Sequence, residues 1–212
     1  MREIYLSLAL LLIFISSITI GIIITNYKQE KKYNFLNSFP YEMENKDYLW
    51  MNLTFRSSLA LFCGVSCVGS LLFFFIGSEY LISQILSLVI LLNSFLLVSL
   101  FIINMKSYKL HLINSIIFMV LNVLSYFLLA YLPFRENFVF YPMWLTIVSI
   151  IIGLILLLML LLPSLKNWYI LKKEDEDKYI RGKVFPLAII EWINIIAYVL
   201  IFIIMLVVYI LK

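Results

Sequence analysis

Long apolar segments recur along this chain, separated by short polar stretches. A bilayer-spanning helix needs about 20 apolar residues. Six segments meet that length, and they cover residues 5–25, 53–76, 80–104, 110–132, 141–162 and 187–211. Backbone groups in lipid must be satisfied within their own segment, and these segments lack the alternation of barrel strands. The pattern therefore predicts an all-α polytopic membrane protein, with six transmembrane helices in one compact bundle and a single domain over residues 1–212.

Glycine, proline and polar residues mark the ends of the segments. Gly77-Ser78-Glu79 predicts a hairpin between the second and third helices, and residues 133–142 predict the connection from the fourth to the fifth. Pro163 predicts the end of the fifth helix, and Pro186 suits the first turn of the sixth, where its missing N–H costs little. The first segment is longer than the core of a signal peptide and no A-x-A-like site follows it, so we expect it to be retained.

Composition agrees with a lipid environment. The chain is 64% hydrophobic and only 13% charged, with a mean hydropathy of +1.05. Soluble domains are closer to half apolar and one quarter charged. No basic patch is interleaved with aromatic residues on a polar face, so we expect no nucleic-acid partner. The lipid bilayer is the partner that composition itself predicts.

The basic residues predict the orientation in the membrane. Residues 26–56, 105–110 and 164–186 hold 13 of the 16 lysines and arginines. Positively charged connections stay on the inner side. We therefore expect cytoplasmic loops at 26–52, 105–109 and 163–186, with both termini extracytoplasmic in the cell (plasma) membrane.

Polar residues inside three of the segments fall on one helical face each. They are Ser83, Ser87 and Ser94 in the third segment; His111, Ser115, Asn122 and Ser125, flanked by Asn114, in the fourth; and Glu191, Asn194, Tyr198 and Tyr209 in the sixth. Polar side chains in lipid face protein or water. The stripes of the fourth and sixth segments therefore predict either contacts between helices or a polar path or ligand cavity.

Glu191 is the one acidic residue within a predicted span. About one turn into its helix, it can reach the cytoplasmic interface, pair with Arg181, Lys183 or another basic residue, or act as a gate, proton or cation ligand. His111 begins the fourth segment, which predicts an interfacial position. A proton relay between His111 and Glu191 is the alternative.

Small residues gather on the second segment. Ala60 and Gly64 are four apart, as are Cys63 and Cys67, which predicts a helix-packing face. Two cysteines one helical turn apart do not suit a disulfide, and a thiolate is costly in lipid.

Two connections carry further patterns. The 26–52 loop holds Phe39-Pro40-Tyr41 and other aromatic residues, so we expect it to dip into the interface or dock on a partner. Residues 165–171 predict a short interfacial helix. The acidic run at 174–177 lacks the spacing of a calcium loop and predicts a solvated turn.

Site chemistry is sparse in this sequence. We find no catalytic, metal, nucleotide or cofactor signature, so we expect no enzyme activity and no cofactor. The favoured function is a non-enzymatic membrane subunit or accessory protein of a transport, secretion or immunity complex, with other membrane-protein subunits or itself as partner. The alternative is a small oligomeric channel or transporter that uses the polar stripes, and an intramembrane enzyme comes third.

Overall fold

A computed structural model describes residues 2–28, 32–43, 48–71, 81–103, 108–135, 142–162 and 184–210. The long helices in these ranges are α1 (Arg2–Asn26), α2 (Leu49–Ser70), α3 (Leu81–Ile102), α4 (Tyr108–Arg135), α5 (Met143–Leu160) and α7 (Pro186–Ile210), and a short 3-10 helix, η1, covers Pro40–Glu42. All six long helices contain stretches long and apolar enough to cross a membrane. The prediction of an all-α, six-span membrane bundle is thereby confirmed.

Most helix ends lie within a few residues of the predicted ones, and α4 differs in an instructive way. It continues through Pro133 to Arg135, where the sequence predicted a connection. Proline inside a helix lacks the backbone N–H that would donate four residues back, here to the carbonyl of Leu129. In the same turn, Thr146 of α5 donates to the carbonyl oxygen of Ala130 at 2.9 Å, which gives that carbonyl a side-chain donor. Packing against α5 therefore supports the last turn of α4.

Several predicted features lie outside the described residues. They are the hairpin at 77–79, Pro163, the interfacial helix at 165–171, the acidic turn at 174–177, and the basic residues Arg181 and Lys183.

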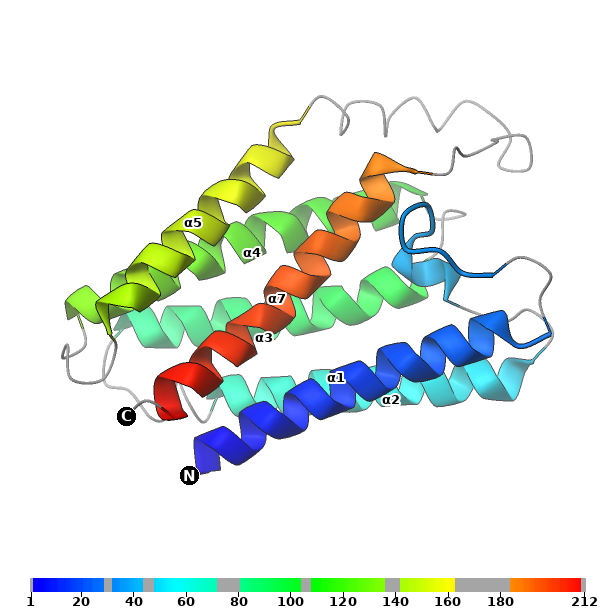
Figure 1. Cartoon of the computed structure of the whole chain (residues 1–212), viewed down its shortest axis with the longest axis horizontal. Coiled ribbons are helices and arrows are strands. Elements are labelled where there is room, and N and C mark those ends of the chain that lie inside the picture. Colours follow the sequence, from blue (N-terminus) through cyan, green and yellow to red (C-terminus); the bar gives the residue numbers. More distant parts are fainter. Residues whose placement is uncertain are drawn as a thin grey trace.

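The helices α1 to α5 pack in chain order, each against the next, and α7 packs against α1, α4 and α5 (Figure 1). This position makes α7 the most enclosed helix: 72% of its span is buried, compared with 28% for α5. The first turn of α1 and the last turn of α7 lie at one end of the bundle, and η1 lies at the other (Figure 1). The outward faces of the other helices are apolar, as lipid contact requires.

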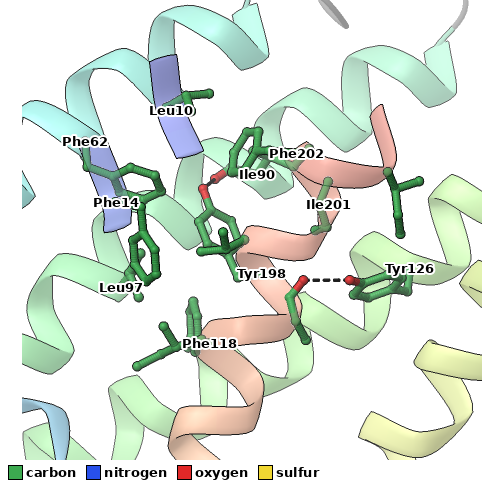
Figure 2. Packing of buried hydrophobic residues seen from close by; sticks show 14 of the residues in the cluster. Leu10, Phe14, Phe62, Ile90, Leu97, Phe118, Tyr126, Tyr198, Ile201 and Phe202 are labelled. Carbon is green, nitrogen blue, oxygen red and sulfur yellow. Dashed lines mark hydrogen bonds between the residues drawn. The ribbon is translucent and has the colours of Figure 1, made fainter. Parts of the chain in front are cut away.

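Aromatic side chains fill the centre of the bundle around Tyr198 of α7 (Figure 2). The ring centroid of Tyr198 lies 6.4 Å from Phe62 of α2, 5.9 Å from Phe118 of α4 and 5.5 Å from Phe202 on its own helix. Aromatic pairs at such distances contribute about 0.5–1.5 kcal/mol beyond the area that they bury. Since these rings come from three helices, they fix α7 against both α2 and α4.

Close helix approach occurs on α1 at Gly21. A Cβ placed there would lie 2.7 Å from Cε2 of the buried Phe55 ring on α2. The small-residue face predicted on α2 is arranged differently: Cys63 is buried, but Ala60 and Gly64 are exposed, and a Cβ on Gly64 would meet no atom within 4 Å. Gly21 thus provides close packing inside the bundle, and Ala60 and Gly64 face outward.

Candidate functional site

The carboxyl group of Glu191 lies in the interior of the bundle. Glu191 is five residues after Pro186, the first residue of α7, which places it about 8 Å along the helix axis. Its side chain is 0% exposed. The sequence had left open an interfacial position for this residue. The structure instead encloses it, because α7 is surrounded by other helices and covered at this end by residues 32–43.

Two side chains of α4 bind the same oxygen of Glu191. Ser115 donates to Oε1 at 2.6 Å, and Nε2 of His111 lies 3.1 Å from that atom. Both residues are almost completely buried. They are four residues apart on α4 and therefore share one face. The structure thus brings together three residues from the two predicted stripes, His111, Ser115 and Glu191, which we call the carboxyl centre.

The second nitrogen of His111 determines where its protons lie. Nδ1 is 2.8 Å from the carbonyl oxygen of Ile103, at the end of α3. A carbonyl oxygen only accepts, so Nδ1 carries a proton. One further proton must then lie between Nε2 and Oε1 of Glu191. With that proton on either atom, the pair has no net charge, which limits the cost of placing it in an apolar interior.

The other oxygen of Glu191 is different. Oε2 is buried and accepts no hydrogen bond from the residues that the structure describes. A buried polar atom without a partner costs about 1–3 kcal/mol, more when it is charged, so it needs a structural or functional explanation. Oε2 is therefore the atom of the carboxyl centre whose capacity to accept a hydrogen bond the described residues leave unused.

Residues 32–43, which we call the covering segment, lie over this end of the bundle. Phe39 is fully buried, and its ring packs edge-on against His111, with centroids 6.0 Å apart. Tyr41 makes a second edge-on contact with His111 at 5.1 Å. The sequence predicted that these aromatic residues would enter the membrane interface or bind a partner. They pack on the helices of their own chain.

Hydrogen bonds fasten the covering segment to α7 and to the residues before it. Trp192, next to Glu191, donates from Nε1 to the carbonyl oxygen of Ser38 at 3.0 Å. The backbone N–H of Phe185 donates to the carbonyl of Leu36 at 2.7 Å. Tyr33 donates to the carbonyl of Phe39 at 2.8 Å, and burial raises the pKa of this phenol, so it stays a neutral donor. The covering segment is thus held by the same helix that carries Glu191.

Buried amides continue from the carboxyl centre into the bundle. Asn194 lies three residues after Glu191 and donates to the carbonyl of Ile190 at 2.9 Å. Asn122 of α4 donates to the backbone carbonyl of Asn194 at 2.9 Å. Asn93 of α3 donates to Oδ1 of Asn122 at 3.2 Å. Asn93 and Asn194 each keep one side-chain oxygen that accepts no hydrogen bond from the described residues.

Hydroxyl groups join α2, α3 and α7 deeper in the bundle. The Tyr198 hydroxyl lies 2.6 Å from Oγ of Ser94, and Ser66 of α2 donates to that same Oγ at 3.0 Å. Tyr126 of α4 donates to the carbonyl of Ala197 at 2.6 Å. The polar interior therefore extends from His111 and Glu191 at one end to the level of Tyr198.

Two further predicted residues make their hydrogen bonds outside this network. Ser125 donates back to the carbonyl of Leu121 in its own helix, and Asn114 donates to Ser99 of α3. The Tyr209 side chain is outside the described part of the structure. Cys63 and Cys67 are both free thiols. Among the described residues, no three His, Cys, Asp or Glu side chains are grouped as metal ligands.

Sequence reasoning missed several of the residues that complete the site. Asn93 and Tyr126 were not singled out, although a buried amide in the middle of an apolar helix is a signal in itself. The covering segment was recognised as too aromatic for a free linker, but nothing in its pattern indicated which helices it contacts. Comparisons of this chain with models of protein families, with curated protein sequences and with solved structures give no match.

Proposed function

We propose that this chain is a multi-pass membrane transport protein that binds and releases a proton at the carboxyl centre. One observation carries the proposal. A fully buried carboxyl group holds His111 and Ser115 on one oxygen and leaves the other oxygen unpartnered. Ionisable groups inside a membrane are costly, and in transport proteins they mark ion and proton pathways. This proposal is the transporter alternative of the sequence analysis.

The geometry supports proton binding because His111 and Glu191 share one proton. When it leaves, Glu191 is a carboxylate that still accepts from Ser115, and His111 is a neutral imidazole that still donates from Nδ1 to Ile103. Both protonation states therefore keep the hydrogen bonds to Ser115 and to the carbonyl of Ile103, and loss of the proton leaves Nε2 and Oε1 facing each other as two acceptors. A centre with two such states suits a cycle of protonation and deprotonation.

Charge distribution supports an orientation for the cycle. The connections rich in lysine and arginine meet the bundle at the end where the covering segment lies, and we place this end in the cytoplasm of a plasma-membrane protein. The covering segment then closes the carboxyl centre from the cytoplasm. A transport cycle would require it to move away from His111 and Trp192.

Infrared difference spectroscopy of the purified protein tests the proposal. We expect a carboxylic-acid C=O band in the difference between spectra taken at acidic and at alkaline pH, because the carboxyl centre releases its shared proton as the pH rises. The band should be absent in Glu191→Gln. Ser115→Ala should shift its midpoint, because the variant removes the donor to the carboxylate. Ser125→Ala is the matched control on α4 and should leave the midpoint unchanged.

Proton exchange at this centre would be contradicted if no pH-dependent carboxylic-acid band appears. It would also be contradicted if the band persists in Glu191→Gln. A band that titrates identically in wild type and Ser115→Ala would contradict the assignment of Ser115 as a donor to the carboxylate.

The outward position of Ala60 and Gly64 favours a second candidate, a subunit of a larger membrane complex. Small residues let helices approach closely, and these two are exposed in the isolated chain. Purification in a mild detergent after crosslinking tests it: a partner should be lost when Gly64 is replaced by leucine. The control is Ile151→Phe on the exposed face of α5. Equal recovery of the partner in both variants would remove this face from the interface.

A further inference from the structure

The unpartnered polar atoms inside the bundle are of one kind. Among the described residues, the buried side-chain atoms without a hydrogen-bond partner are all oxygens: Ser87 Oγ, Asn93 Oδ1, Ser149 Oγ, Glu191 Oε2 and Asn194 Oδ1. Two are hydroxyls, which can donate or accept. The carboxyl oxygen of Glu191 and the two amide oxygens have no proton of their own unless the acid is protonated. In this part of the molecule, the interior has an excess of acceptors.

Hydrogen bonds to backbone carbonyls fix the orientation of the side-chain amides, and this orientation determines which amide oxygens remain without a donor. Asn194 donates to the carbonyl of Ile190, so its Nδ2 and Oδ1 cannot be exchanged without placing two oxygens together. Asn122 donates to the carbonyl of Asn194, which turns its Oδ1 towards Asn93. Asn93 must then present Nδ2 to Asn122. The leftover atom is therefore an oxygen at both Asn93 and Asn194.

These acceptors follow one another from the carboxyl centre inwards. Glu191 and Asn194 are three residues apart on α7, so they share a face and differ by about 4.5 Å along the axis. Asn122 connects the backbone of Asn194 to Asn93 on α3. Three of the leftover oxygens, Glu191 Oε2, Asn194 Oδ1 and Asn93 Oδ1, thus belong to side chains of α7 and α3 that adjoin one another through Asn122 of α4, and we call them the acceptor line.

We propose that the acceptor line binds a small monovalent cation, with Glu191 Oε2 as its first ligand, in exchange for the proton shared by His111 and Glu191. This inference rests on the proposed transport function, because it uses the same carboxyl group. An anion at these atoms would meet only acceptors. A cation meets carboxyl and amide oxygens, the ligands that hard cations prefer.

The charge balance sets the exchange at one proton for one cation. With the shared proton present, the His111–Glu191 pair is neutral. When the proton leaves Nε2 or Oε1, the pair carries one negative charge on the Glu191 carboxylate, and a monovalent cation restores neutrality. A divalent cation would leave an uncompensated charge in a low-dielectric interior, which is costly. The exchange needs no oxidant or other reactant.

Among the described residues, the other titratable groups that interact with the pair belong to the covering segment. They are Tyr33, Tyr41 and Glu42, and Glu42 accepts from the backbone N–H of Phe39 at 2.7 Å. An additional carboxyl group close enough to interact with His111 favours a cation over an anion here.

Proton release from the purified protein tests the exchange. The detergent-solubilised protein is placed in a weakly buffered solution with a pH indicator, and lithium, sodium, potassium or methylammonium chloride is added. Choline chloride controls for ionic strength, and sodium sulfate controls for the anion. We expect at least one small cation to release about one proton per protein, choline to release none, and sulfate to match chloride at equal sodium.

Variants separate the acceptor line from the carboxyl centre. Asn93→Leu and Asn194→Ala should each weaken the response to the cation by about tenfold or more, which corresponds to the loss of about 1.4 kcal/mol of binding. Both should keep the Glu191 infrared band. Asn194→Ala preserves the backbone carbonyl that Asn122 binds, so it carries the test if Asn93→Leu does not fold. Ser17→Ala on α1 is the control, because Ser17 bonds only to its own helix at Ile13 in the contacts described.

Two results would overturn the inference. One is proton release that is equal for every salt, choline included, or absent for all of them. The other is a cation response that both asparagine variants retain in full. If the Glu191 band still titrates in either case, the proposed proton binding stands and only the cation is excluded. If the band is also absent, both proposals fail.

Discussion

His111 and Glu191 are 80 residues apart in the chain, yet Nε2 of one lies 3.1 Å from Oε1 of the other. The contact joins α4 to α7 at a point where neither side chain reaches solvent. Since Nδ1 of His111 is committed to Ile103 of α3, the pair ties three helices together through one imidazole ring. Its removal should therefore affect both stability and proton binding.

We expect His111→Leu to destabilise the protein by about 1–3 kcal/mol, because it leaves the buried carboxyl group of Glu191 without the imidazole that shares its proton. The double variant His111→Leu/Glu191→Leu should be more stable than His111→Leu alone, since it removes the orphaned group as well. Unfolding in a graded detergent mixture measures both. Additive losses in the double variant would show that the two residues are not coupled.

We expect Gly21→Ala to destabilise the packing of α1 on α2 by about 1–3 kcal/mol, the usual cost of an overpacked contact. The new methyl group would meet the ring of Phe55, which is buried and packs against the ring of Phe101 at a centroid distance of 5.7 Å. Gly64→Ala is the matched control on the neighbouring helix, and it should be neutral or slightly stabilising, because its Cβ meets no atom and alanine favours helix. Thermal denaturation in detergent compares them, and a Gly21→Ala protein as stable as Gly64→Ala would contradict the close approach.

We expect the covering segment to lose stability above about pH 10. The pKa of Tyr33 is raised by burial from an ordinary value of 10.0. A group whose folded pKa is raised contributes stability that is complete below the unfolded pKa and declines as pH rises above it. Tyr33→Phe should therefore be less stable by about 1 kcal/mol at neutral pH, through the lost hydrogen bond to Phe39, and should show a smaller decline at high pH.

Melting temperatures at several pH values between neutral and alkaline conditions measure this difference. Tyr5→Phe is the control, since Tyr5 is 66% exposed on α1. An alkaline decline in Tyr33→Phe as steep as that of the wild type would assign the effect to other tyrosines.

We expect single cysteines at opposite ends of the bundle to label from opposite sides of the membrane. In a background with Cys63 and Cys67 replaced by alanine, Tyr5→Cys should react with an impermeant maleimide in intact cells. Leu36→Cys, in the covering segment, should react only after permeabilisation. Both positions are more than half exposed, so access depends on the side of the membrane. The reverse pattern would invert the orientation inferred from the basic residues.

The polar stripes illustrate how far a pattern in one segment can go. Helical periodicity placed His111, Ser115 and Asn122 on one face of the fourth segment and Glu191 and Asn194 on one face of the sixth. It could not show that these faces meet, because periodicity describes the direction of a side chain about its own axis and says nothing about the neighbouring helix. The possible relay between His111 and Glu191 was left as an alternative for this reason.

The small-residue face on α2 shows the same limit, because here a spacing motif predicted a helix contact that the chain does not make. The spacing of Ala60 and Gly64 predicted close packing, but both residues face outward, and the close approach occurs at Gly21, which no spacing motif marks.

The amino-acid sequence by itself determined that this protein crosses a membrane six times in helical segments. Length and hydropathy are sufficient for that, since lipid leaves the backbone few alternatives to a helix. The tertiary structure alone decided that α7 is central, that Glu191 is enclosed rather than interfacial, and that residues 32–43 cover it. The physical reason is that the hydrophobic effect, which inserts the helices into the membrane, acts almost equally on all sides of each helix. Their arrangement depends instead on shape and on a few hydrogen bonds between residues far apart in the chain.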